Sequence, residues 1–252
     1  MNFSGKTAIS TGAASGMGLL FAQNWAELGG NVVMCDVNES VLSEKVDEIN
    51  SKGGGRAVGV ICDVRDYKQV CNARDKAVEE FGSIDVMCNF AGGCAVRMLN
   101  VDLSLEFPDV PIEAYDWGLD VNLKGQFYFG HAVMKQMREQ KSGLIVNIGS
   151  TAGAEGDCLS IEYSTAKSGA MVGLTKSLAQ YGSIYGVRCV CVSPGPVLTR
   201  PSMATTHTLL HRAAEPQEVI DVILFIASDK GQFIDGENIM VDGGRNAANR
   251  GC

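Results

Sequence analysis

Short apolar runs alternate with segments of helical periodicity along almost the whole of this 252-residue chain, and this alternation restricts the possible folds more than any other feature. The longest helical segments are expected at about residues 113–139 and 162–185. Because parallel strands need helical crossovers and bury both faces, the pattern predicts an α/β fold in which helices cover both faces of a doubly wound, parallel, seven-stranded sheet. The expected strands are residues 7–10, 32–35, 58–61, 84–88, 144–148, 187–192 and 238–241.

The expected elements follow one another without an evident domain boundary. No linker, low-complexity tract or charge run interrupts the alternation. Hydrophobic residues make up 46% and charged residues 20% of the chain, which is ordinary for a globular protein, and a chain of this length suits one large α/β core. We therefore expect residues 1–252 to form a single domain.

The charge balance and the hydropathy pattern exclude several classes of partner. With 29 acidic and 21 basic residues, the chain has a formal net charge of −8, which disfavours binding to a nucleic-acid backbone. No secretion leader precedes the first apolar run, and no apolar run approaches the roughly 18 residues of a membrane helix. These features predict a cytoplasmic protein with neither a nucleic-acid partner nor a membrane partner.

The nine cysteines are an odd number, lie mostly within apolar runs and form no CxxC pair. Only three histidines are present, so no metal site is expected. We interpret the cysteines as buried thiols in a reducing compartment. They are Cys35, Cys62, Cys71, Cys88, Cys94, Cys158, Cys189, Cys191 and Cys252.

A glycine-rich turn separates the first expected strand from the first expected helix. Glycine accounts for 30 of the 252 residues, about 12% against an average near 7%. In the turn, Gly12 would permit the bend, Gly16 the approach of a ligand and Gly18 the packing of the helix. Backbone N–H groups and the helix dipole in such a turn can hold a pyrophosphate, as in a dinucleotide-binding (Rossmann) fold. The alternative is an ordinary tight turn without a ligand.

Asp36 stands at the end of the second expected strand, 18 residues after Gly18. A carboxylate at about this separation binds the ribose 2′-hydroxyl of NAD and would repel the 2′-phosphate of NADP. No lysine or arginine occupies Ser15, Val37 or Asn38 to attract that phosphate. The sequence therefore favours NAD as cofactor. The alternative is that Asp36 only forms a turn at the strand end.

Tyr163 and Lys167 lie four residues apart near the start of an expected helix, so their side chains share one face. A phenol normally titrates near 10, but an adjacent ammonium group and a cationic nicotinamide would both favour the phenolate. Such a tyrosine could move a proton while a hydride passes to or from the cofactor. The alternative, for this pair alone, is an ordinary pair on a helix surface.

The complete set of motifs resembles the short-chain dehydrogenase/reductase family over residues 6–244. The motifs follow one another in order on the expected loops, at fitting distances. They are TGxxxGxG at residues 11–18, Asp36, Asp63 with Val64, residues 89–92, Asn122, Ser150, Tyr163 with Lys167, and Pro194 with Gly195.

This resemblance implies a catalytic role for four residues. Tyr163 would be the general acid or base, and Lys167 would bind the nicotinamide ribose and lower the pKa of the tyrosine. Ser150, thirteen residues before Tyr163, would orient the substrate oxygen. Asn122 resembles the asparagine that holds a water molecule in the proton relay.

The resemblance also implies which residues contact NAD. The glycine turn would bind the pyrophosphate, Asp63 and Val64 would meet the adenine, and the backbone near Pro194 would bind the carboxamide. Residues 89–92 would stabilise the sheet and line the cofactor site. The implied cofactor contacts are Gly12, Ser15, Gly16, Met17, Gly18, Asp36, Asp63, Val64, Asn89, Ala91, Gly92, Tyr163, Lys167, Pro194, Gly195, Val197 and Thr199.

Two positions depart from the pattern of the family. Phe90 stands where the family usually has a second asparagine, and Asp235 with Gly236 replaces the usual Thr-Gly before the last strand. Neither position is expected to touch the reacting atoms, so the departures do not argue against activity.

The substrate loops are the least predictable part of the chain. Residues 93–111 are longer than the family norm and residues 200–214 are shorter. One hypothesis is a basic rim that binds a carboxylate or phosphate, and the alternative is a set of scattered, solvated side chains. The rim would consist of Arg97, Arg200, His207, His211 and Arg212.

Two further side chains have ordinary structural interpretations. We interpret His131, in a long expected helix, as a packed helical histidine rather than a catalytic one. Cys158 could line the substrate cleft, but we interpret it as a small packing residue.

The sequence therefore predicts an NAD-dependent oxidoreductase that interconverts a secondary alcohol and a ketone by hydride transfer. The expected substrate is a small molecule: a polyol or sugar, a hydroxy acid or a hydroxysteroid. The alternatives are an enzyme similar to 3-oxoacyl-carrier-protein reductase and a catalytically silent NAD-binding regulatory module. Because the two long helices commonly pair between subunits in this family, we also expect a homo-oligomer, either a dimer or a tetramer.

Overall fold

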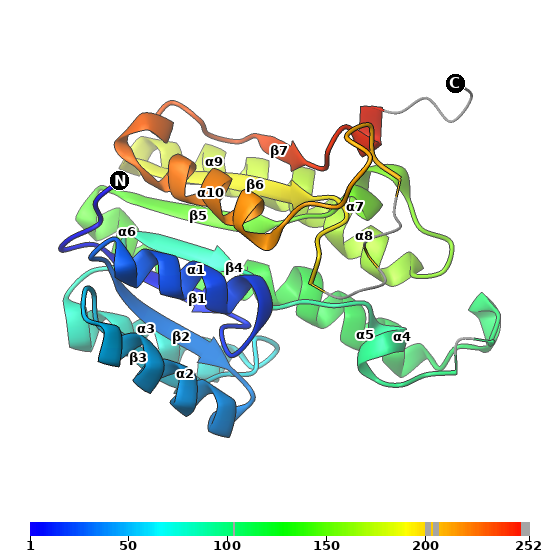
Figure 1. The fold of residues 1–252 in the computed structure, drawn as a ribbon, viewed down its shortest axis with the longest axis horizontal. Coiled ribbons are helices and arrows are strands. Elements are labelled where there is room, and N and C mark those ends of the chain that lie inside the picture. Colours follow the sequence, from blue (N-terminus) through cyan, green and yellow to red (C-terminus); the bar gives the residue numbers. More distant parts are fainter. Residues whose placement is uncertain (103, 200–202, 204–206, 248–252) are drawn as a thin grey trace.

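The computed structural model describes residues 1–102, 104–199, 203 and 207–247 (Figure 1). Within these residues, seven strands form one sheet in the order β3-β2-β1-β4-β5-β6-β7, and all neighbouring strands run parallel. The predicted fold class is therefore confirmed. The strands are β1 (Thr7–Thr11), β2 (Asn31–Asp36), β3 (Ala57–Ile61), β4 (Val86–Asn89), β5 (Gly143–Ile148), β6 (Val187–Pro194) and β7 (Asn238–Val241).

Helices cover both faces of the sheet, and each face has its own apolar core. On the face toward the viewer in Figure 1, α1 (Gly16–Glu27) and α10 (Pro216–Ala227) cover the central strands, and α2 (Glu39–Lys52) contributes to the same core. The opposite face carries α3 (Tyr67–Phe81), α6 (Gly125–Gln140) and α9 (Thr175–Gly182). Burial on both sides explains why the strands read as continuous apolar runs rather than as alternating ones.

Both long helices predicted from the sequence are present, and each contains a π-helical segment near its middle. The first runs through α5 (Ile112–Leu119), a π turn (Asp120–Lys124) and α6. The second runs through α8 (Ile161–Gly169), a π turn (Ala170–Leu174) and α9. The wider turns leave carbonyl groups without their usual helical donors, and side chains supply replacements. Periodicity alone did not predict these turns.

The strand order reverses between β1 and β4, because the chain proceeds from β1 to one edge of the sheet and from β4 to the other. In doubly wound sheets, ligands bind at such a reversal, beyond the carboxyl ends of the strands. Two short helices, α4 (Ala95–Met98) and α7 (Thr151–Glu155), follow strands β4 and β5 at this edge. The fold thus directs attention to the loops that follow β1, β4 and β5.

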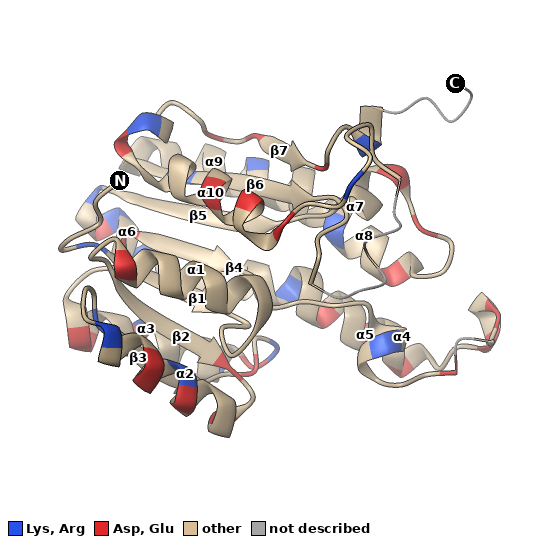
Figure 2. Ribbon diagram, in the orientation of Figure 1, with Lys and Arg blue, Asp and Glu red and all other residues tan. Residues whose placement is uncertain are grey.

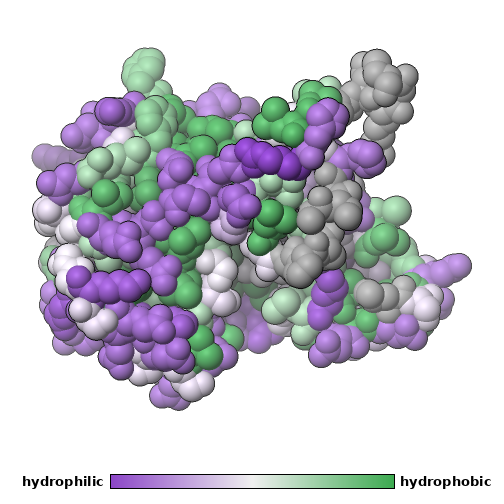
Figure 3. All heavy atoms as spheres, in the orientation of Figure 1, coloured by the Kyte–Doolittle hydropathy of each residue, from purple (hydrophilic) through white to green (hydrophobic). Residues whose placement is uncertain are grey.

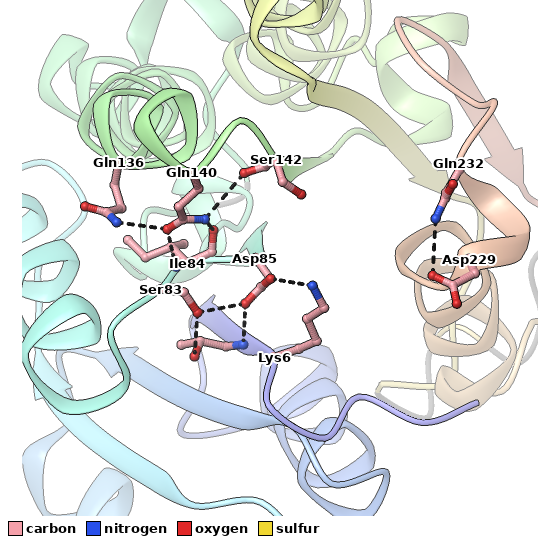
Figure 4. A network of polar contacts seen from close by, with 10 residues as sticks. Lys6, Ser83, Ile84, Asp85, Gln136, Gln140, Ser142, Asp229 and Gln232 are labelled. Atoms are coloured by element: carbon pink, nitrogen blue, oxygen red, sulfur yellow. Dashed lines mark hydrogen bonds and ion pairs between the residues drawn. The ribbon is translucent and has the colours of Figure 1, made fainter.

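A network of hydrogen bonds stabilises the opposite edge of the sheet, at the amino ends of the strands (Figure 4). The carboxylate of Asp85 accepts hydrogen bonds from the Lys6 ammonium group, the Thr7 amide and the Ser83 hydroxyl, each at 2.9 Å. The side chain of Gln140 accepts from the N–H of Ile84 and donates to its carbonyl oxygen, also at 2.9 Å. A cavity of about 870 Å³ lies at this edge, and the ion pair of Lys6 and Asp85 lines it.

Charged residues lie mostly on the helices and loops around the sheet (Figure 2). On the face covered by α1, α2 and α10, hydrophilic side chains surround separate apolar ones (Figure 3). Among the described residues, no helix combines the length and apolar character that a membrane crossing requires.

Candidate active site

The turn after β1 requires glycine at three positions. Gly12 has φ +62°, and a Cβ atom there would lie 3.1 Å from the Cα of Ala91 in the loop after β4. Gly16 has φ +56°, a conformation that residues with a side chain rarely adopt. At Gly18, a Cβ atom would overlap the carbonyl oxygen of Gly12. The glycines therefore permit the bend and let α1 begin directly against the turn.

The amino end of α1 is open to a ligand. Its N-cap residue Ser15 has extended backbone, and its side chain makes no capping hydrogen bond. The first turn of the helix carries no acidic residue. Free N–H groups and the positive end of the helix dipole favour an anion at this place.

Asp36 is held at the end of β2 by two backbone hydrogen bonds. Its Oδ2 atom accepts from the N–H of Ala14 at 3.0 Å, and its Oδ1 atom accepts from the N–H of Asn38 at 3.0 Å. The first bond ties the carboxylate to the glycine turn itself. Asp36 therefore lies at the same cavity as the turn, as the sequence suggested.

A cavity of about 400 Å³, here called the cofactor groove, joins the loops after β1, β2, β3 and β4. It brings together ten of the residues predicted to contact the cofactor: Gly12, Ser15, Gly16, Met17, Gly18, Asp36, Asp63, Val64, Ala91 and Gly92. Sequence reasoning missed several others that line it, notably Arg65, Met98, Trp117 and Val121.

Arg65 places a cation in the groove, but a neighbouring acid neutralises its charge. Its guanidinium group contacts both carboxylate oxygens of Asp63, with the shortest N···O distance at 2.6 Å. The hydrogen bonds from Arg65 lower the pKa of Asp63, and the carboxylate in turn raises the pKa of Arg65. The arginine two residues after Asp63 was the available sequence signal for this pair.

Asn89 lies beneath the groove rather than in its lining. It is buried at the end of β4, and its Nδ2 atom donates to Oδ1 of Asn147 on β5 at 3.0 Å. Asn147 in turn donates to the hydroxyl of Thr175 at 3.0 Å. The contacts of Asn89 thus link β4 to β5, which fits the sheet-stabilising role that the resemblance implied.

Tyr163 and Lys167 come together on α8. The Lys167 Nζ atom lies 5.6 Å from the centroid of the Tyr163 ring. The lysine is only 2% exposed, and its ammonium group donates to the carbonyl oxygen of Ile148 at 2.8 Å. Burial lowers the pKa of Lys167 to about 8. At neutral pH a positive charge therefore lies beside the phenol, where it favours the phenolate.

A second cavity of about 880 Å³, here called the substrate cleft, lies between α4 and the segment that contains α7 and α8. Ser150 and Tyr163 both line it. Ser150 is the N-cap residue of α7, and its hydroxyl oxygen accepts from the N–H of Ala152 at 3.2 Å. This leaves the hydroxyl proton of Ser150 to donate to a ligand.

Asn122 is buried in the first π turn, and its side chain is fully engaged with backbone groups. Its Nδ2 atom donates to the carbonyl oxygens of Gly93 and Gly118, at 2.8 and 2.9 Å. Its Oδ1 atom accepts from the N–H of Gly93 at 3.0 Å. Both amide protons and one acceptor site of Oδ1 are bound to backbone groups, so Asn122 positions the loop after β4.

Gln126 is a structural residue that sequence reasoning missed. Since β4 ends at Asn89, the N–H and carbonyl groups of Ile148 have no strand partner on that side. Gln126, only 2% exposed, accepts from that N–H at 3.0 Å and donates to that carbonyl at 3.1 Å. It also donates to the Asn122 carbonyl oxygen at 2.6 Å, within the π turn. A polar residue on the apolar face of the expected helix was the sequence signal that could have identified Gln126 as a buried hydrogen-bonding residue.

Comparison with known proteins agrees with this geometry. A family model described as enoyl-(acyl carrier protein) reductase matches residues 12–246, which include the glycine turn, the tyrosine and the lysine. The chain belongs to the short-chain dehydrogenase/reductase family. It is an oxidoreductase with the Rossmann fold of that family.

Individual relatives cover nearly the whole of this short-chain dehydrogenase/reductase. An uncharacterized oxidoreductase of Thermotoga maritima is 35% identical, over 98% of this chain and 100% of its own length. A trans-4-hydroxycyclohexanecarboxylate dehydrogenase of Sinomonas cyclohexanicum is 36% identical, over 97% of this chain and 94% of its own. The crystal structure of a 3-oxoacyl-[acyl-carrier protein] reductase with bound NAD from Brucella melitensis has a TM-score of 0.88 at 31% identity, covering 97% and 92% of the two chains.

The loop after β6 of this short-chain dehydrogenase/reductase runs between the end of the sheet and the substrate cleft. Pro194 ends β6, and Gly195 lines the cleft, where its N–H donates to the carbonyl oxygen of Val241 at 2.9 Å. Val197 is buried and bridges to Ala214, whereas Thr199 is exposed. Of these four predicted cofactor contacts, only Gly195 lines either cavity.

The structure does not assemble the basic rim that the sequence suggested. The guanidinium group of Arg212 is bound to both carboxylate oxygens of Glu218, at 2.6 and 2.7 Å, and does not line the substrate cleft. His207 and His211 are exposed and do not line it either, and Arg200 lies outside the described residues. Arg97 alone of the described members lines the cleft.

His131 is exposed on α6, where its ring packs against Phe127 and Tyr67 and its Nδ1 atom shares a hydrogen bond with the Tyr67 hydroxyl. It lines neither the cofactor groove nor the substrate cleft. The interpretation of Cys158 as a small packing residue was wrong. Cys158 is exposed and lines the substrate cleft, because the loop after α7 carries it to the surface.

The other cysteines mostly follow the prediction. Six are buried, Cys71 is half-buried, and Cys252 lies outside the described residues. Burial raises the pKa of the Cys191 thiol to about 11, so it is protonated at neutral pH. The buried thiols are Cys35, Cys62, Cys88, Cys94, Cys189 and Cys191.

Proposed function

We propose that the chain is an NAD-dependent enzyme that interconverts a secondary alcohol and a ketone by direct hydride transfer. The observation that carries this proposal is the pair of Tyr163 and Lys167, in which a buried ammonium group lies beside the phenol that lines the substrate cleft. An intact pair of this kind argues against a catalytically silent NAD-binding module.

The cofactor groove fits a dinucleotide. The glycine turn and the open amino end of α1 would hold the pyrophosphate, and Asp36 would bind the ribose hydroxyl groups. Asp36 also supports a preference for NAD, because Arg65, the cation that lines the groove within the described chain, is already paired with Asp63. A 2′-phosphate would meet a carboxylate without a free positive charge.

Each residue of the cleft has a distinct task in the proposed reaction. NAD, when bound, supplies the hydride acceptor. Tyr163 takes the hydroxyl proton of the alcohol as the carbonyl forms, and it returns the proton in the reverse direction. Lys167 favours the phenolate form of the tyrosine through its charge, and Ser150 donates a hydrogen bond to the substrate oxygen. Gln126 holds the Ile148 backbone to which the lysine donates, and Asn122 holds the loop after β4 at Gly93.

The substrate classes that the sequence left open were polyols or sugars, hydroxy acids and hydroxysteroids. The similarity to a hydroxycyclohexanecarboxylate dehydrogenase favours a hydroxy acid among them. The solved 3-oxoacyl-[acyl-carrier protein] reductase with bound NAD supports a second candidate, the reduction of a 3-oxoacyl thioester. Asp36 is compatible with either reaction, with NAD as the oxidant of a hydroxy acid or NADH as the reductant of a 3-oxoacyl thioester.

A screen of NAD and NADP reduction tests the function, with cyclohexanol, 4-hydroxycyclohexanecarboxylate, polyols, sugars and hydroxysteroids as substrates. The second candidate is tested in the reverse direction, with a 3-hydroxyacyl thioester as the substrate and its oxidation to the 3-oxoacyl thioester as the readout. We expect NADH formation with at least one secondary alcohol. Absence of NADH formation across all of them, by protein that binds NAD, would revive the regulatory-module hypothesis.

We further propose that the chain forms a homo-oligomer through its two long helices. Their outer faces expose apolar side chains, among them Leu119 and Phe127 on the first helix and Val172 and Tyr181 on the second. Apolar faces of this kind commonly become subunit interfaces. Light scattering should give a multiple of the 26.8 kDa chain mass, and it would distinguish a dimer from a tetramer.

The remaining expectations are a single domain over residues 1–252 and a cytoplasmic location. The first is supported by the sheet, in which strands from both ends of the chain take part. The second is supported by the buried thiols, which suit a reducing compartment.

A further inference from the structure

Among the described residues that line the substrate cleft, Arg97 is a cation without an ion-pair partner. Arg97, on α4, lines the cleft and is exposed. In the chain as far as the structure describes it, no carboxylate lies within ion-pair distance of its guanidinium group. A planar guanidinium group presents donors in a fork that matches a carboxylate.

The other charges of the cleft are already engaged. Arg245 contacts both carboxylate oxygens of Glu155, with a 3.0 Å contact between Nη2 and Oε2. Asp157 accepts from the Leu159 N–H at 3.0 Å and from the Ser160 hydroxyl at 2.6 Å, which fixes the turn before α8. Of the described charged residues that line the cleft, Arg97 is thus the positive group left for an incoming ligand, and Glu155 and Asp157 have protein partners.

The short helix that carries Arg97 is fixed to the helix that carries Tyr163. Glu162, the residue before the tyrosine, is only 4% exposed, and its Oε1 atom accepts from the N–H of Ala95 at 3.2 Å. The preceding loop is held at Gly93 by both polar atoms of the Asn122 side chain. The guanidinium group therefore extends from a backbone whose position relative to the reacting phenol is determined by buried contacts.

Apolar side chains contribute to the lining of the cleft, beside polar ones such as Ser150 and Ser160. Val96, Leu159, Pro196 and Met203 line the same cleft. The apolar side chains would pack against a hydrocarbon body of the substrate. The lining of the cleft thus combines the tyrosine, Tyr163, with apolar surface and a cation, Arg97.

We propose that Arg97 binds a carboxylate of the substrate, so that the enzyme acts on hydroxy acids in which a hydrocarbon body separates the carboxylate from the reacting carbinol. This inference rests on the proposed function, because it names the substrate class of the same cleft. Arg97 determines specificity and takes no part in hydride or proton transfer.

The test compares two pairs of compounds that differ only in charge. Turnover is measured with 4-hydroxycyclohexanecarboxylate and its carboxamide, and binding to the NAD-saturated enzyme is measured by calorimetry with cyclohexanecarboxylate and cyclohexanecarboxamide. A charge-assisted, bidentate contact predicts that Arg97→Met lowers kcat/KM and affinity for the carboxylates by about tenfold to hundredfold. Values for the carboxamides should remain within about twofold. Arg97→Lys, which keeps the charge but loses the fork, should fall between the two.

Arg56→Met is the matched control, because it removes one positive charge from an exposed site before β3, where Arg56 pairs with Glu80. It should leave both pairs of values unchanged. Equal losses for carboxylate and carboxamide in Arg97→Met, or a carboxylate preference that survives the substitution, would overturn the inference.

The calorimetric arm separates this inference from the proposed function, since it requires no turnover. Carboxylate binding that depends on Arg97, without oxidation of any alcohol, would support the anion site and contradict the enzymatic function. Oxidation of cyclohexanol by an enzyme whose carboxylate binding does not depend on Arg97 would support the enzymatic function and contradict the anion site.

Discussion

The cofactor groove and the substrate cleft lie at the same edge of the sheet but are built in different ways. The groove, of about 400 Å³, depends on backbone shape, with glycines at positive φ and a close approach between the turn after β1 and the loop after β4. The cleft, of about 880 Å³, depends on side chains from loops and short helices. A fold can keep one cofactor site while its substrates vary from protein to protein. Backbone geometry therefore suits the cofactor groove, and loop side chains suit the substrate cleft.

The two regions also differ in how they treat charge. In the groove, Arg65 and Asp63 neutralise one another near the surface. Behind Tyr163 of the cleft, the charge of Lys167 is buried, and no carboxylate of the described residues pairs with it. This burial destabilises the fold but favours the phenolate. Substitutions in one region should therefore leave the properties of the other unchanged.

The largest effect is expected for Tyr163→Phe, which removes the proton-transfer group of the cleft and nothing from the groove. Turnover should fall by about 10²- to 10⁴-fold, the range typical of general acid–base catalysis. The affinity for NAD, measured by calorimetry, should change little. Tyr67→Phe, at a surface tyrosine that binds His131, is the control and should keep wild-type turnover. Near-normal turnover of Tyr163→Phe would contradict the assigned role.

Lys167→Met should abolish most activity and yet stabilise the protein. The folded pKa of about 8 lies below the ordinary 10.5, so below pH 8 the buried ammonium group costs about 3 kcal/mol. Between pH 8 and 10.5 the unfolded chain binds more protons than the folded one, and the stability of the wild type therefore rises with pH. The free energy of unfolding of the variant should exceed that of the wild type at pH 7, by an amount that shrinks as pH rises through this window.

Denaturant unfolding at several pH values in the absence of cofactor measures this difference. Lys176→Met, at an exposed lysine of α9, serves as the control and should show no such pH dependence. A variant that is less stable than the wild type at pH 7 would mean that the hydrogen bond to Ile148 outweighs the cost of burial.

The groove was largely predictable from the sequence because its residues are required by backbone geometry. Gly12 and Gly18 stand where any side chain would meet backbone atoms, and Asp36 stands at a strand end whose position the alternation already predicted. Arg65 escaped prediction because nothing in the local pattern demands a cation there. Its role follows only from the way β3 brings it beside the groove.

The cleft was less predictable because its lining depends on tertiary contacts. The sequence grouped Arg97 and Arg212 as one basic rim, but α10 supplies Glu218 to Arg212 and nothing comparable to Arg97. The π turns were not predicted either, since they depend on replacement donors such as Gln126 and the Thr175 hydroxyl. A residue whose partner is distant in sequence cannot be assigned from spacing alone.

A smaller effect is expected for Gln126→Leu, which acts on the support of the cleft rather than on its surface. The substitution leaves the buried N–H of Ile148 unpaired, and this should lower the free energy of unfolding by about 2 kcal/mol. Thermal and denaturant unfolding measure the loss, and Gln180→Leu, at an exposed position of α9, is the control. An unchanged stability would mean that the backbone of Ile148 finds another partner.

The smallest effect, and the sharpest for the comparison, is expected for Asp36→Ala. Without the carboxylate, NAD loses a ribose contact and NADP no longer meets a negative charge, so the ratio of kcat/KM for NAD over NADP should fall by about tenfold. Asp36→Asn removes the negative charge but keeps one oxygen acceptor for the N–H of Ala14 or Asn38. It therefore separates the effect of the charge from the effect of these backbone hydrogen bonds. The preference for a carboxylate over its carboxamide that we assign to Arg97 should survive both substitutions, because Arg97 lines the other cavity. A substrate preference that changed together with the cofactor ratio would show that the groove and the cleft form one coupled site, and an unchanged cofactor ratio would remove Asp36 from the recognition of the ribose.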